Sequence, residues 1–343
     1  MAAPSLIQRA RAAWRLRRKR RRLLFRAWVA GRSLVKIADR TASIGAGHIL
    51  LVATLRNEAL RLPHFLDHYR KLGINHFLLV DNASTDGTAD LLRDQPDVSL
   101  WSAPGSYRAA RFGLDWTNAL LMRHGHGYWT LTVDADELLV YPYWETRDLH
   151  ALTHWLQRTD RMAFGAMMLD LYPKGPVGNA TCRPGDNPTN VMSWFDAGNY
   201  SVTLQAPMEN LWIQGGVRAR VFLAETPRLA PTLNKVPLVK WHWRYAYVNS
   251  THSLLPRRLN RVYATDGGEV TSGLILHTKF LADAAEKSTE EQTRRQHFAR
   301  PDDYRDYHER LAASPVLWTE ASTALGGWRQ LESLGLMSRG GWV

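Results

Sequence analysis

The chain has 343 residues, a net charge of +12 and a single cysteine, Cys182. One cysteine excludes an intramolecular disulfide framework and fits a reducing compartment. No apolar run approaches the roughly 18 to 20 residues that cross a bilayer, and no apolar core of a secretory signal follows the first charges. These features exclude a disulfide-rich secreted scaffold and a membrane-spanning segment, and they leave a globular body as the expected class.

The first forty residues carry the net charge of the whole chain. They hold thirteen Lys or Arg and one acid, Asp39, so residues 41–343 balance at zero. Seven positive charges fall within residues 15–22, and leucines and aromatic residues follow them. Such a composition is typical of a segment lying on anionic lipid, although transit peptides, nucleic-acid-binding clusters and disordered arms share it. We expect residues 1–45 to form a basic segment that lies on a membrane surface or is disordered.

Apolar strands alternate with helices in the next part of the chain. The pattern predicts strands over residues 48–54, 76–80, 98–101 and 128–133, and helices over residues 58–72, 85–93 and 109–124. This alternation indicates right-handed crossovers and a mostly parallel sheet flanked by helices. Open sheets of this kind bind ligands at the carboxyl ends of their strands.

Three carboxylates directly follow the fourth predicted strand: Asp134, Asp136 and Glu137. A strand buried on both faces cannot keep unpaired carboxylates inside, so these acids must emerge at its carboxyl end. Mg²⁺ and Mn²⁺ bind carboxylate oxygens, and substrate phosphates commonly complete their coordination. A helix amino-terminal cap would use the same residue types, so the neighbouring loops must decide between the two interpretations.

Polar loops also follow the first two predicted strands, at residues 54–58 and 81–88. The carboxylate of Asp81 is suited to accept hydrogen bonds from a base or ribose, and Arg56 is suited to face a phosphate. A turn with a helix cap is the alternative for the second loop. Three polar loops at one sheet edge favour a ligand site.

These loops resemble a known family of enzymes. The order Arg-Asn-Glu at 56–58, Val-Asp-Asn-Ala-Ser-Thr-Asp-Gly-Thr at 80–88 and Asp-Ala-Asp-Glu at 134–137 is similar to the nucleotide-sugar-binding half of the family 2 glycosyltransferases, which have the GT-A fold. The chain resembles the bacterial branch with an Asp-Asn-Xaa-Ser loop and an Asp-Ala-Asp-Glu metal motif. Softer matches extend the resemblance over residues 48–281, at 215–222, 235–241 and 272–281.

The resemblance implies roles for particular residues. It places the following residues of the first two loops at the nucleoside: Thr54, Arg56, Asn57, Glu58, Asp81, Asn82 and Ser84. It places Asp134 near the ribose and metal, assigns Asp136 to a divalent cation, and matches His277 to the late histidine that completes the metal shell. Imidazole is an acceptable ligand for Mn²⁺, and a buried hydrogen-bonded histidine is the alternative. Arg111 and Asn118, seven positions apart on one predicted helix, share a face and are candidates for the diphosphate, with a solvated Arg111 as the alternative.

Glycosyl transfer also requires a general base. The leaving diphosphate needs positive charge, which Asp134, Asp136 and a cation supply together, and the acceptor hydroxyl must lose its proton to a carboxylate. The family usually places one such acid after the metal motif and inverts the anomeric centre. The candidates in this sequence are Asp196, Glu209, Glu225 and Asp266. Of these we favour Glu209 and Asp266. No Glu-Asp pair marks the position.

The carboxyl end predicts a helical extension over residues 282–343, after a GT-A domain at 46–281. Residues 283–295 read as a charged helix, and Tyr304, Tyr307 and Leu311 share a helical face that should pack on the body. Glycine pairs near the end predict a frayed tail.

The sequence therefore predicts a metal-dependent inverting glycosyltransferase, with Mn²⁺ or Mg²⁺ as its cofactor. The expected partners are a nucleoside-diphosphate sugar donor, a glycan or lipid-linked acceptor of surface-polysaccharide synthesis, and an anionic membrane contacted by residues 1–40. The expected location is cytoplasmic, with peripheral contact at the inner face of the membrane. One alternative is a nucleotidyltransferase, against which the lack of glycine in residues 54–58 argues. The other is a non-catalytic membrane or nucleic-acid binder that uses the basic arm, although we expect no specific nucleic acid.

Overall fold

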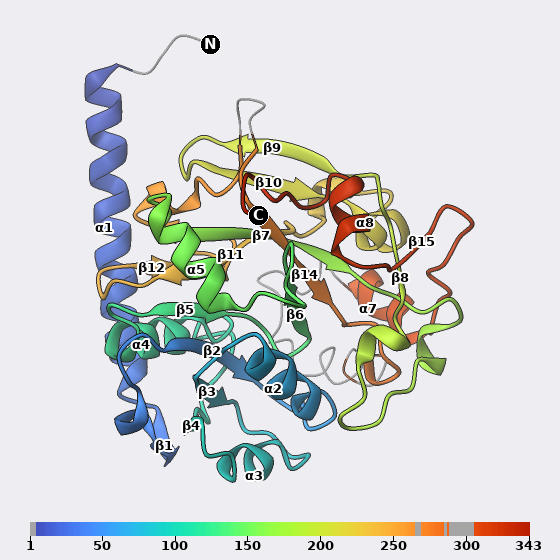
Figure 1. Cartoon of the computed structure of the whole chain (residues 1–343), viewed down its shortest axis with the longest axis horizontal. Coiled ribbons are helices and arrows are strands. Elements are labelled where there is room, and N and C mark those ends of the chain that lie inside the picture. The colour runs from blue at the N-terminus through green and yellow to red at the C-terminus, as the bar shows by residue number, and fades with distance from the viewer. Residues whose placement is uncertain (1–4, 265–268, 285–286, 288–304) are drawn as a thin grey trace.

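A nine-stranded sheet forms the centre of the computed structural model, which describes residues 5–264, 269–284, 287 and 305–343. The strand order is β1-β4-β3-β2-β5-β11-β7-β14-β6, and helices cover both faces (Figure 1). Strands β4, β3, β2, β5, β7 and β14 run in one direction, and β1, β11 and β6 run in the other. The predicted mostly parallel α/β sheet is confirmed.

The first half of the sheet matches the predicted alternation. Its parallel strands are β2 (Ile49–Leu55), β3 (His76–Asp81), β4 (Val98–Ser102) and β5 (Trp129–Thr132). The helices between them are α2 (Leu62–Lys71), α3 (Thr88–Arg93) and α4 (Leu114–His124). Each helix begins later than predicted. Gly87 and Gly113, in left-handed conformations, directly precede α3 and α4 and end the loops before them.

Both faces of these strands are buried, which explains their unbroken apolar sequences. In β2, Ile49 and Leu51 belong to a core shared with α2 and α5 (Leu149–Arg158), whereas Leu50 and Val52 pack on the opposite side with α4. Successive side chains of a strand point to opposite faces. The run therefore has no polar face.

The second half of the sheet joins segments that are distant in sequence. It contains β6 (Glu137–Val140), β7 (Ala163–Asp170), β11 (Asn234–Lys240) and β14 (Ser272–His277). Strand β11 runs antiparallel between β5 and β7, and β6 pairs antiparallel with β14. The amino ends of β6 and β11 therefore lie at the same edge as the carboxyl ends of the parallel strands.

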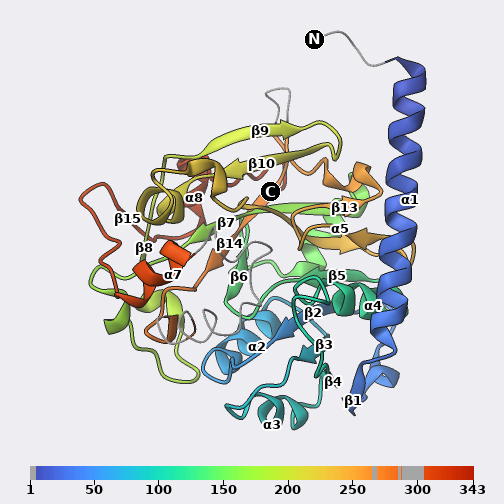
Figure 2. The same ribbon diagram turned by 180° about the vertical axis from the view of Figure 1, so that it is seen from behind.

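The basic amino-terminal segment is built into this body. Helix α1 (Leu6–Gly31) is capped by Ser5 and runs along one side of the molecule beside α4 (Figures 1 and 2). Strand β1 (Val35–Ala38) then pairs antiparallel with the edge strand β4. The disordered interpretation is therefore wrong for residues 6–31, because Leu23 and Ala27 are buried against the body.

Small two-stranded sheets surround the main one. Their strands are β8 (Trp194–Phe195) with β15 (Thr323–Ala324), β9 (Ser201–Gln205) with β10 (Asn210–Gln214), and β12 (Ala246–Tyr247) with β13 (Leu254–Leu255). The β12–β13 pair supports α1, since Ala246 and Leu255 share a buried cluster with Leu23. Among the described residues, no helix has the length and apolar composition needed to cross a membrane.

The carboxyl end contains α7 (Arg305–Ala312) and α8 (Trp328–Ser333). Tyr307 and Leu311 are buried, and the Tyr307 ring lies 4.8 Å from that of Phe222, so the packed face is confirmed for these two residues. Tyr304 and most of the predicted helix 283–295 lie outside the described residues. The expectation of a frayed tail is wrong, because the Trp342 ring packs 5.7 Å from Tyr141 and is buried in the main core.

Candidate functional site

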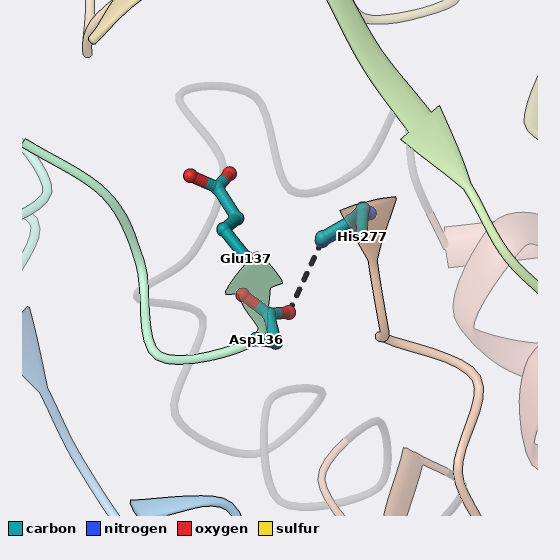
Figure 3. Close-up of side chains that lie close together, drawn as sticks. All are labelled: Asp136, Glu137 and His277. Carbon is teal, nitrogen blue, oxygen red and sulfur yellow. Dashed lines mark ion pairs between the residues drawn. The ribbon is translucent and has the colours of Figure 1, made fainter. Parts of the chain in front are cut away.

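Two carboxylates hold His277 at the carboxyl edge of the sheet. His277 ends β14, Asp170 ends β7, and Asp136 lies between β5 and β6. The His277 Nε2 atom lies 3.1 Å from Asp136 Oδ2, as Figure 3 shows, and its Nδ1 atom lies 2.6 Å from Asp170 Oδ1. Burial alone would lower the pKa of His277, but Asp136 and Asp170 raise it to about 9.

Arg218 completes this chain of charges behind His277. Its Nε donates to Asp170 Oδ2 at 2.7 Å, and its side chain is buried. Burial tends to raise the pKa of Asp170, yet Arg218 and His277 hold it below its usual range. Asp170 therefore orients the imidazole so that Nε2 faces Asp136. A carboxylate on the far ring nitrogen is the usual support of a metal-binding histidine.

A second ion pair lies beside the first. Lys235, near the start of β11, contacts the Glu137 carboxylate, and both side chains are buried. The Lys235 ammonium also lies 3.6 Å from Asp134 Oδ2. Burial would lower the pKa of Lys235, but Glu137 and Asp134 raise it above its usual value. The lysine therefore offsets part of the negative charge that the three clustered acids bring together.

Asp134 is the most accessible acid of the cluster. Desolvation by the surrounding chain and the charge of Glu137 raise its pKa to about 7, although 56% of the side chain remains exposed. Solvent at the exposed side limits this rise. The exposed carboxylate is open to a ligand that approaches the sheet edge.

The residues fit a hard divalent cation. In the described part of the chain, Asp136, Glu137 and His277 each offer one ligand atom, and these atoms lie within 4.8 Å of one another (Figure 3). Two oxygens and one imidazole nitrogen suit Mn²⁺ or Mg²⁺. Asp136 and His277 thus come together as predicted. Glu137 joins them, whereas Asp134 lies beside Lys235.

The two loops predicted to contact a nucleoside, residues 54–58 and 81–88, are hydrogen-bonded to each other. The Asn57 amide N–H donates to Ser84 Oγ at 3.0 Å, and Asn57 Oδ1 accepts from the Thr85 amide at 2.8 Å. Asp81 Oδ2 accepts from the Ser84 amide at 3.2 Å. The other oxygen, Asp81 Oδ1, is buried with no hydrogen-bond partner in the described structure. A buried carboxylate oxygen without a donor is costly, and a ligand N–H or O–H would satisfy it.

Other predicted residues of these loops support the backbone. Arg56 Nη1 donates to the carbonyls of Asn82 and Ala83 at 2.8 and 2.6 Å. The Asn82 side-chain amide (Nδ2) donates to the Ala103 carbonyl at 2.6 Å. The Thr54 hydroxyl lies 3.4 Å from the Thr117 hydroxyl. These contacts give the loops a defined shape around Asp81.

Glu58 belongs to a partly buried charge network just before α2. Its carboxylate lies 3.1 Å from Arg61 Nη1 and 2.6 Å from Lys287 Nζ. Burial raises the pKa of Glu58, while Arg61 and Lys287 oppose this rise. Arg61 also contacts Asp283 at 2.7 Å and lowers the pKa of Asp136. The two acids and two bases balance in charge, and of the four it is the Arg61 guanidinium that acts on Asp136.

The structure places Arg111 and Asn118 in packing roles. Both amide atoms of Asn118 bind the Tyr247 backbone, at 3.2 and 2.9 Å. Arg111 contacts Asp115 and the Val248 carbonyl. The helical-face argument for this pair is wrong, because α4 begins only at Leu114 and Arg111 has a positive φ of 54°.

The predicted general bases do not join the acidic cluster in the described structure. Glu209 lies in the β9–β10 turn, 2.9 Å from Arg257 and 2.7 Å from Arg261. Asp196 is held by Arg220 at 2.9 Å. The remaining candidates are Glu225, which is exposed, and Asp266, which lies outside the described residues. Two arginines therefore hold Glu209 in this turn, away from the acidic cluster.

Sequence reasoning missed several members of the site: Arg61, Asp170, Arg218 and Lys235. Asp170 carried a signal, because it follows the apolar run 163–169 just as Asp134 follows 128–133. Lys235 and Arg218 carried none, since their partners lie 98 and 48 positions away.

Comparison with known proteins gives distant matches to solved structures. No family model and no curated protein matches the chain. Among solved structures, a protein described as a glucose-1-phosphate thymidylyltransferase from Bacillus anthracis matches at 8% identity and a TM-score of 0.26, over 41% of this chain and 65% of that one. A UDP-glucose pyrophosphorylase from Acinetobacter baumannii matches at 11% identity and a TM-score of 0.29, over 58% and 75%. A 4-diphosphocytidyl-2C-methyl-D-erythritol synthase matches at 16% identity and a TM-score of 0.25, over 40% and 68%. Similarities this low do not establish an activity for the chain.

Proposed function

We propose that the protein is a metal-dependent glycosyltransferase that transfers a sugar from a nucleoside-diphosphate sugar to a hydroxyl acceptor. One observation carries the proposal. The linked residues Asp136, His277 and Asp170 lie at the same sheet edge as Asp81, whose buried Oδ1 has no partner in the described structure. The reaction requires a cation site and, at the same edge, a hydrogen-bond acceptor for the nucleoside of the donor.

In this proposal each residue has a defined task. Asp136 and His277 would hold the divalent cation, which would supply positive charge for the leaving diphosphate. Asp170 positions His277 through Nδ1. Asp81 Oδ1 would accept a hydrogen bond from the base or ribose, and the accessible Asp134 would lie near the ribose. The acceptor is a glycan or a lipid-linked glycan.

Donor turnover tests this proposal. Purified protein is incubated with Mn²⁺ and a panel of nucleoside-diphosphate sugars, and release of the nucleoside diphosphate is measured. Asp136→Asn should lower the rate at least 100-fold, because it removes a charged ligand of the cation. The matched control is Asp94→Asn, an exposed acid at the end of α3, which should retain the rate.

Two results would contradict the proposal. Full turnover in Asp136→Asn would show that Asp136 does not bind a cation needed for the reaction. Pyrophosphate release from a nucleoside triphosphate and a sugar 1-phosphate, without donor turnover, would instead assign a nucleotidyltransferase.

A further inference from the structure

Helix α1 has two opposite faces of different character. Leu23 and Ala27 are 6% and 0% exposed and pack on the body. On the other side, large apolar residues face solvent: Ile7 66%, Trp14 61%, Phe25 64%, Trp28 48% and Val29 48% exposed. At 3.6 residues per turn, these five fall within an arc of about 100° that lies opposite Leu23. The body covers the inner face, so the outer stripe is available to a partner.

Positive charge surrounds the outer stripe. The segment Leu6–Gly31 contains ten Lys or Arg and no acid. By helical position, Arg17 and Arg21 lie along one border of the stripe, while Arg18 and Arg22 lie along the other, and all four are exposed. A partner that covers the stripe must therefore be apolar in its middle and negatively charged beside it.

A basic groove lies on one flank of the same helix. It has a volume of about 1000 Å³ and runs between α1 and the loop before α4. Its lining includes five basic residues of α1 together with Arg108 and Arg111, and Trp14 and Leu23 add apolar surface. Phosphate groups attached to an apolar molecule match this combination of charges and rings.

We propose that α1 docks the protein on an anionic membrane surface. The helix lies parallel to the bilayer, with Trp14, Phe25 and Trp28 at the boundary between headgroups and acyl chains. The bordering arginines and the basic residues of α1 that line the groove bind lipid phosphates. Aromatic residues next to dense Arg and Lys are the composition of helices that lie in this interface.

A lipid surface explains more of these observations than a nucleic acid does. Phosphates of either partner would satisfy the arginines, but exposed Ile7, Phe25 and Val29 have no counterpart on a nucleic-acid backbone. The docking does not rest on the proposed function.

Vesicle flotation with the full chain tests the docking, without any donor present. The protein should bind vesicles with 30% phosphatidylglycerol in phosphatidylcholine and should bind pure phosphatidylcholine at least tenfold more weakly. Phe25→Glu/Trp28→Glu should weaken binding to the anionic vesicles at least tenfold. The matched control is Val202→Glu/Leu204→Glu on β9, whose residues are 56% and 59% exposed, and it should bind like the unmodified protein. Thermal unfolding of each variant confirms that it is folded.

A depth measurement provides a second readout. Lipids brominated near the headgroup should quench part of the tryptophan fluorescence, and Trp14→Phe/Trp28→Phe should lose that part while it still binds. Three results would overturn the proposal: no binding to anionic vesicles, unchanged binding by Phe25→Glu/Trp28→Glu, or binding to a DNA duplex with no binding to vesicles. Because no donor is added, failure here is distinct from failure of the proposed reaction.

Discussion

Asp170 orients His277, and its effect on metal binding can be measured without changing the proposed ligand His277 itself. The Asp170 carboxylate contacts His277 Nδ1 and also forms an ion pair with the buried Arg218. Asp170→Asn should therefore weaken Mn²⁺ binding about 10- to 100-fold, as loss of such supporting contacts does. It should also destabilise the fold by about 3–5 kcal/mol, because Arg218 loses its carboxylate while buried. Calorimetric titration with Mn²⁺ and urea unfolding measure the two effects.

A double variant separates these two effects. Asp170→Asn/Arg218→Met removes the unpaired charge, so the stability should recover while Mn²⁺ binding stays weak. Recovery of both would show that Asp170 serves only the fold.

His68 gives a pH dependence with a defined sign. It is buried on α2, with Nε2 at 3.0 Å from the Leu139 carbonyl, and burial lowers its pKa to about 4. The unfolded chain, with an ordinary pKa near 6.5, binds more protons between pH 6.5 and 4. Stability should therefore fall as the pH drops through this window, by an amount on the order of 3 kcal/mol. Urea unfolding of His68→Gln should show a shallower loss, and parallel curves would contradict the assignment.

At the scale of elements, α1 is part of the fold as well as a surface. Leu23→Ala should lower the free energy of unfolding by about 2–4 kcal/mol, because Leu23 is 6% exposed against the body. Phe25→Ala, two positions away and 64% exposed, should change it by less than about 0.5 kcal/mol. Equal effects of the two substitutions in urea unfolding would show that α1 does not pack as described.

The same packing changes how the basic segment should be tested. Removal of residues 1–40 would also remove β1, which covers the edge of β4. An uncovered edge strand pairs readily with other chains. Substitutions on the outer face of α1 therefore separate membrane docking from folding better than a truncation does.

At the scale of the whole molecule, the sequence predicted those elements whose signal is local. The strands of residues 48–133 were predictable because burial on both faces makes each one a continuous apolar run. The second half was not, since β11 inserts between β5 and β7 from a distant segment. The residues of the site likewise fall into those that local sequence could predict and those that it could not. Asp136 and Asp81 follow local strand ends, whereas the contacts of Lys235 and Arg218 arise only when distant strands pair.

We propose that this sheet edge binds a nucleotide through a divalent cation. The most direct measurement is a thermal-shift titration of the full chain with nucleoside diphosphates and their sugars, with and without Mn²⁺, because a ligand that prefers the folded state raises its stability. We predict that one nucleotide raises the Tm only when Mn²⁺ is present, and that Asp136→Asn abolishes the shift. No shift with any nucleotide in well-folded protein, or an equal shift without the cation, would contradict the claim.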